Sequence, residues 1–72
     1  MNQKKISITV NGEVRQCQTN LSLSQLLENL QFNLRLIAVE YNGEILHRQF
    51  WDSTIVNGGD KLEIVTIVGG GC

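Results

Sequence analysis

The chain has 72 residues, which suffice for one domain but not for both a hydrophobic core and an enclosed substrate pocket, so most enzyme classes are excluded. Six Lys and Arg against seven Asp and Glu give a formal net charge of −1, which indicates neither a nucleic-acid-binding surface nor an acidic tail. Hydrophobic residues make up 42% of the chain and charged residues 18%, a composition typical of a folded domain. We therefore expect a small domain that acts with a partner.

Nothing in the sequence indicates secretion or membrane insertion. The first residues are followed by alternating rather than continuous apolar side chains, unlike a signal peptide. No run approaches the apolar length of a membrane span, about 18 residues. We therefore expect a cytoplasmic protein that binds neither nucleic acid nor a membrane.

The Cys and His residues are too few for a disulfide framework or a zinc site. The chain has two cysteines, Cys17 and Cys72, and one histidine, His47. We interpret Cys17 as a small apolar residue near a strand end rather than a reactive thiol, and His47 as a surface or turn residue. We expect no catalytic residue, no metal and no cofactor bound by the chain itself.

The first predicted elements form a β-hairpin. Residues 4–10 alternate between apolar and polar side chains, which is the period of a half-buried strand. Asn11 and Gly12 are the residues that a type I′ hairpin turn prefers. A second strand over residues 13–17 should therefore pair antiparallel with the first.

The pattern then changes to a helical period. Leucines recur at the i, i+3, i+4 and i+7 spacing that buries one stripe of a helix: Leu23, Leu26, Leu27 and Leu30. Ser22 and Gln25 have the spacing of a capping box. The sequence predicts a helix over about residues 23–30 that lies across the sheet.

Three further strands are predicted after the helix. They cover residues 36–41, 44–46 and 61–68, with turns at Asn42-Gly43 and at residues 57–60. Between them, the four-residue spacing of Trp51 and Ile55 indicates a short helical turn that fixes a long connection to the core. The element order predicts an α+β domain with one helix packed on a mixed sheet.

The last predicted strand changes character along its outer face. If Leu62 and Ile64 point into the core, the outward residues change from charged ones to Val65 and Ile67 just before a run of glycines. An outward Val65 and Ile67 would form a docking patch for a partner. The alternative is that a neighbouring loop covers the end of this strand.

The chain has seven glycines and no proline, and three glycines stand together at 69–71. The other glycines lie in predicted turns, whereas Gly69, Gly70 and Gly71 follow a strand and belong to no turn or helix cap. We expect a flexible tail there. Extended, residues 67–71 reach roughly 17 Å, which is enough to pass through a narrow channel into the active site of another protein.

Several segments together resemble the ThiS family, the sulfur carriers of thiamin thiazole biosynthesis. They are "IAVEYNGEI" (37–45), "QFW" (49–51), "NGGDKLEIV" (57–65) and "VGGG" (68–71), in this order behind a leucine-rich helix. The resemblance implies a β-grasp, ubiquitin-like fold with a mixed sheet of four to five strands and one main helix. It divides the chain into a β-grasp domain at 1–68 and a flexible tail at 69–72.

The resemblance also implies a function as a protein substrate rather than an enzyme. In the family, a ThiF-like, E1-like adenylyltransferase uses ATP and Mg²⁺ to adenylate the C-terminal glycine, a sulfur-donating enzyme supplies sulfur, and a ThiG-like thiazole synthase takes it from the thiocarboxylate. By position, Gly71 would hold the reactive carbonyl, and Gly69 and Gly70 would thread into the partner active sites. Val65 and Ile67 are the predicted partner contacts.

The sequence departs from the family pattern at its last residue, because Gly71 is followed by Cys72 and its carbonyl is in an amide bond. We expect a peptidase to remove Cys72 from a precursor. Alternatives are a carrier in a cysteine-making pathway, sulfur carried by the Cys72 thiol itself, and an extension without function. A MoaD-like carrier for molybdopterin and a β-grasp binding module with an inert tail also remain open.

Overall fold

The computed structural model describes residues 4–67, and those at 1–3 and 68–72 lie outside this description. The chain forms eight elements in the order β1 (Lys5–Val10), β2 (Glu13–Gln18), α1 (Leu23–Asn29), the 3-10 helix η1 (Leu34–Leu36), β3 (Ile37–Tyr41), β4 (Glu44–Ile45), the 3-10 helix η2 (Arg48–Ser53) and β5 (Lys61–Thr66). Each predicted strand and the predicted helix are present, with ends that differ from the prediction by one or two residues.

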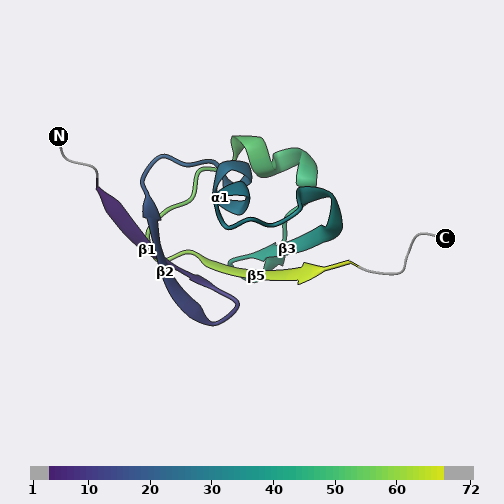
Figure 1. Ribbon diagram of the computed structural model, residues 1–72, viewed down its shortest axis with the longest axis horizontal. Coiled ribbons are helices and arrows are strands. Elements are labelled where there is room, and N and C mark those ends of the chain that lie inside the picture. Colours follow the sequence, from purple (N-terminus) through teal and green to yellow (C-terminus); the bar gives the residue numbers. More distant parts are fainter. Residues whose placement is uncertain (1–3, 68–72) are drawn as a thin grey trace.

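The five strands form one mixed sheet in the order β2-β1-β5-β3-β4. β1 and β5 pair parallel at the centre, and the other neighbours pair antiparallel. Figure 1 shows α1 and η2 on one side of the sheet, while no described helix lies on the other side. The α+β prediction of one main helix on a mixed sheet is confirmed, and the sheet has five strands.

The core lies between the sheet and α1. Strand side chains alternate, so every second residue of β1, β3 and β5 points toward the helix. The buried apolar side chains of the described chain are Ile8, Val10, Leu23, Leu26, Leu27, Ile37, Val39, Trp51, Val56, Leu62 and Ile64. Burying one such side chain is worth about 2 kcal/mol, so this cluster supplies most of the driving force for folding.

Local side-chain hydrogen bonds begin α1 where the sequence predicts. The Gln25 amide donates to Ser22 Oγ at 3.1 Å, and the Ser22 amide donates to Gln25 Oε1 at 3.0 Å. This reciprocal pair is the predicted capping box, which satisfies amides that the first turn of a helix leaves free. α1 ends at Asn29, and Leu30 at its C-cap is half-buried.

The connection between β4 and β5 is fixed by Trp51, as predicted, but not by Ile55. Trp51 is buried in η2, and its indole Nε1 donates to Leu46 O at 2.9 Å. Ile55 is 47% exposed and forms an isolated bridge with Ser22. The prediction for Ile55 is wrong because η2 ends at Ser53, so the helical spacing does not extend to it.

A buried carboxylate fixes the loop that leads into β5. Asp60 accepts hydrogen bonds from the Tyr41 hydroxyl, from Asn42 Nδ2 at 3.2 Å and from the Asn57 amide at 2.7 Å. Burial, the hydrogen bond to Asp60 and the charge of that carboxylate together raise the pKa of Tyr41 to about 12. The network holds the turn before β5 against the β3–β4 turn.

We expect Tyr41→Phe to lower the free energy of unfolding by about 1 kcal/mol, because Asp60 keeps two of its three donors. The pKa of Tyr41 is raised above its unfolded value of about 10, so its contribution is fully present below pH 10 and is lost as the pH rises toward 12. Urea unfolding of both proteins across this range should therefore show the difference shrinking above pH 10. A difference that stays constant with pH would contradict this interpretation.

Candidate functional site

The end of β5 carries the predicted partner contacts. Leu62 and Ile64 are buried, whereas Val65 is 60% and Ile67 is 50% exposed, so the outer face becomes apolar as the alternation predicts. No described loop covers this end of the strand. The role of Val65 and Ile67 in binding stays a prediction.

β5 ends at Thr66 rather than at residue 68, but the backbone is held for one residue more. The Ile67 amide donates to Leu36 O at 2.6 Å, which places it beside η1. The residues predicted to carry the chemistry and the processing, Gly69, Gly70, Gly71 and Cys72, lie outside the described part of the chain.

Two asparagine side chains position β5, which the sequence analysis missed. The ladder between β1 and β5 covers two residue pairs only, and Asn11 continues it with its side chain. Asn11 Nδ2 donates to Ile64 O at 3.1 Å, and the Ile64 amide donates to Asn11 Oδ1 at 2.7 Å. On the other side of β5, the Lys61 amide donates to Asn42 Oδ1 at 2.8 Å. Both hairpin turns therefore hold the strand that leads to the tail.

A shallow groove lies on the sheet face that has no helix. Residues of β3, β4 and β5 line it: Ala38, Val39, Glu40, Ile45, Glu63 and Val65. Directly paired residues of neighbouring strands share a face, and the register pairs Ala38 with Val65 and Glu40 with both Glu63 and Ile45. The groove is therefore a product of sheet register, and it contains the predicted contact Val65.

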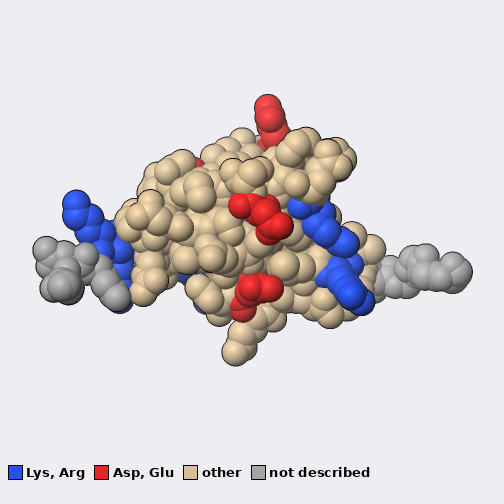
Figure 2. Space-filling view, turned by 90° about the horizontal axis from the view of Figure 1, so that it is seen from above, with Lys and Arg blue, Asp and Glu red and all other residues tan. Residues whose placement is uncertain are grey.

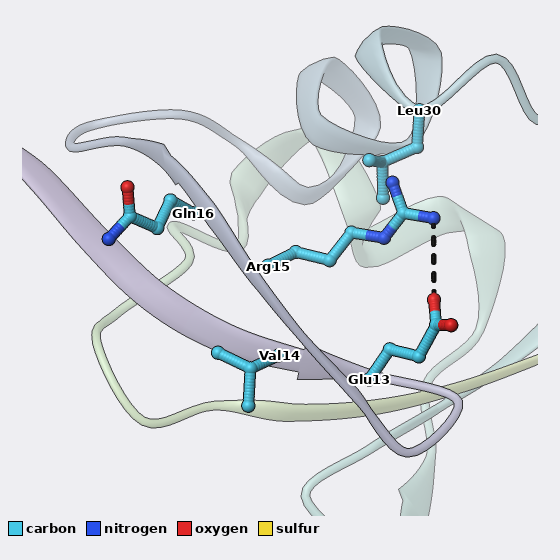
Figure 3. A pocket seen from close by; sticks show the side chains of 5 residues that line it. All are labelled: Glu13, Val14, Arg15, Gln16 and Leu30. Carbon is cyan, nitrogen blue, oxygen red and sulfur yellow. Dashed lines mark ion pairs between the residues drawn. The ribbon is translucent and has the colours of Figure 1, made fainter.

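A second hollow lies between β2 and the end of α1. Glu13, Val14, Arg15, Gln16 and Leu30 line it, and Figure 3 shows Arg15 reaching over the hollow toward Leu30 and Glu13. Arg15 Nη2 lies 3.7 Å from Glu13 Oε1, and both side chains are exposed. These residues include no nucleophile paired with a base, so the hollow has no recognisable catalytic arrangement.

The other candidate residues of the described chain have structural surroundings. Cys17 is half-buried and packs against the core, and burial raises the pKa of its thiol, so its interpretation as an apolar residue is confirmed. His47 is exposed at the N-cap of η2, where its side chain makes no capping hydrogen bond. Among residues 4–67, no group of three His, Cys, Asp or Glu side chains could hold a metal ion.

The charged side chains form no single field. Figure 2 views the molecule from the side of α1 and η2 and shows acidic and basic groups in separate small clusters, with basic ones toward both ends. Within the described residues, no helix is both long and apolar enough to span a bilayer.

Comparisons with known proteins identify the family. The family model described as ThiS matches residues 8–71, which is most of the chain and ends at Gly71. The chain belongs to the ThiS family. The crystal structure of the thiamine biosynthesis protein ThiS from Geobacter metallireducens is 35% identical, covers 92% of this chain and all of that one, and has a TM-score of 0.81. The predicted β-grasp fold of ThiS proteins is thereby confirmed.

Relatives by sequence place this ThiS chain among small carrier proteins. The Escherichia coli sulfur carrier protein ThiS is 29% identical over 92% of this chain and all of its own length. The Porphyra purpurea protein ycf40 is 49% identical over 99% of this chain and all of its own length. A thiazole synthase of Paramagnetospirillum magneticum is 39% identical over 92% of this chain, which corresponds to 20% of that longer protein. Together, these likenesses support a role as a sulfur carrier.

Proposed function

We propose that this chain carries sulfur as a thiocarboxylate at Gly71 and donates it for thiazole formation in thiamin biosynthesis. The observation that carries the proposal is the match to the ThiS family through Gly71, on a fold whose last strand leads toward that residue. The chain is then a protein substrate, and its partners perform the catalysis. Its body serves for recognition and its chemistry is one carbonyl group.

Activation is needed because a carboxylate is a poor electrophile. A Gly71 carboxylate oxygen attacks the α-phosphorus of ATP, held with Mg²⁺ by an E1-like adenylyltransferase, and pyrophosphate leaves. Sulfur at the sulfide level, supplied by a donor enzyme, then attacks the carbonyl carbon of the acyl adenylate. AMP leaves with the electrons of the C–O bond, so one oxygen is exchanged for sulfur without a net redox change.

The peptide bond between Gly71 and Cys72 must be broken before this chemistry. We propose that a peptidase hydrolyses it with one water molecule, which leaves a carboxylate on Gly71 and releases Cys72. The family match ends at Gly71, which supports this boundary. The chain that includes Cys72 is then a precursor.

The second proposed partner is a thiazole synthase. Part of the longer Paramagnetospirillum magneticum protein resembles this chain, so a ThiS-like segment and a thiazole synthase occur there in one polypeptide. Fusion raises the effective concentration of two domains that meet in one reaction. The same pairing as separate chains is the proposal for this protein.

Mass spectrometry tests the proposal directly. The form that ends at Gly71, incubated with ATP, Mg²⁺, the E1-like adenylyltransferase of the same cell and sulfide, should gain the mass of one O-to-S exchange. The form that keeps Cys72 should not gain it under the same conditions. Equal gain by both forms would show that Gly71 is not the site, and no gain by either would reject the proposal.

We expect the double variant Val65→Asp and Ile67→Asp to weaken binding to the adenylyltransferase by about 100-fold, because two carboxylates replace apolar contacts. Both side chains are exposed, so circular dichroism should show an unchanged fold. Val14→Asp is the matched control, since Val14 is 74% exposed on β2, away from the end of β5. Unchanged affinity in the double variant, measured by titration calorimetry, would exclude this patch.

A further inference from the structure

Two carboxylates stand side by side on the open face of the sheet. Glu40 of β3 and Glu63 of β5 are direct cross-strand partners, and both are exposed. Side chains at such positions begin about 5 Å apart, and like charges there destabilise the sheet. Neither forms an ion pair in the described chain, although Lys61 lies two residues before Glu63 on the same face.

This pair flanks an apolar surface. Ala38, Ile45 and Val65 line the same groove, and Ile45 is 69% and Val65 is 60% exposed. A groove of this kind offers contact for one apolar side chain, and the carboxylate pair next to it favours a cation. An arginine fits both carboxylates best, because its planar guanidinium carries several donors that two acceptors can share.

We propose that this groove is the docking surface for the activating enzyme, which inserts an apolar side chain between Ile45 and Val65 and places an arginine over Glu40 and Glu63. This rests on the proposed function, because the enzyme that receives the tail must hold the body beside β5. The unfavourable carboxylate pair of the free protein is then neutralised in the complex.

The charges argue against other occupants. A second copy docked face to face through the same groove would bring its own carboxylate pair against this one. Nucleic acids and anionic lipid surfaces carry the wrong charge for it. A basic protein surface with a protruding apolar side chain is the partner that fits.

The test measures affinity and stability in the same variants. The E1-like adenylyltransferase is titrated with the Gly71-terminated protein, with Glu40→Gln, with Glu63→Gln and with both changes together. The double variant should bind about tenfold more weakly and with a smaller dependence on salt. The same variant should unfold at a higher urea concentration, by about 0.3 M, because the like-charge repulsion is relieved. Glu28→Gln on α1 removes an exposed charge elsewhere and should change neither quantity.

Opposite effects on binding and stability distinguish a docking site from a structural pair. Unchanged affinity in the double variant would overturn the proposal, even when the wild-type protein binds and gains sulfur. A wild-type dimer that the double variant dissociates, seen by analytical ultracentrifugation, would make a second copy the occupant and would also overturn it. Failure of the proposed function is a separate result, because the wild-type protein would then gain no sulfur.

Discussion

Deleting Gly70 and Gly71 from the form that ends at Gly71 is expected to abolish sulfur loading without changing stability. The buried apolar side chains of the described chain all lie between Ile8 and Ile64, so the deletion removes none of them. The shortened chain still ends in a glycine carboxylate, but that carboxylate lies about 7 Å short of its place in the partner active site. Intact-mass measurement after incubation with the adenylyltransferase, ATP and sulfide gives the loading, and urea unfolding gives the stability.

A variant of equal length separates reach from shape. Replacing Gly70 and Gly71 by Ala keeps the position of the terminal carboxylate but adds two methyl groups to the threading segment. We expect this variant to load slowly, because a narrow channel that accepts glycine excludes a Cβ atom. Full loading of the deleted form would show that the tail is not the carrier and would favour a binding module that acts through its body alone.

Most of the fold was predictable because each element has a local signal. The alternation before Asn11 and the leucine spacing after Ser22 describe one strand and one helix without any knowledge of the partner strands. The five-stranded sheet follows once each segment is paired with its neighbours. Ile55 was misjudged because helical spacing alone does not show where a short 3-10 helix ends.

The surface of the candidate site was predictable only in part. The alternation of β5 places Val65 outward, but no local pattern shows that Glu40 lies directly opposite Glu63. That neighbour relation depends on the register between β3 and β5, and a shift of one residue would turn every outward side chain inward. The groove is therefore a property of the assembled sheet rather than of any segment.

The role of Asn11 was also hidden, because its position in an Asn-Gly turn already explains the residue type. Its φ of 51° is the left-handed conformation that asparagine tolerates, and nothing in the sequence assigns a task to its side chain. In the structure, that side chain replaces a missing strand residue beside Ile64. Where β1 stops, Asn11 is what continues to hold β5 from that side.

Asn11→Gly is expected to lower the free energy of unfolding by about 2 kcal/mol, since two hydrogen bonds to the β5 backbone are lost. Glycine keeps the left-handed turn, so the loss reports the side chain alone. Asn20→Gly is the matched control: Asn20 also has a positive φ, of 66°, and is exposed, and no side-chain hydrogen bond to it is seen among residues 4–67. Urea unfolding should show a change near zero for this control.

Hydrogen exchange gives a second, local measurement of the same contact. The Ile64 amide donates to Asn11 Oδ1, so this amide should exchange faster in Asn11→Gly, by more than the loss of global stability explains. The Ile67 amide donates to Leu36 O on the other side of β5 and should follow global stability only. Equal acceleration at both amides would mean that Asn11 stabilises the whole domain rather than the edge of β5 that precedes the tail.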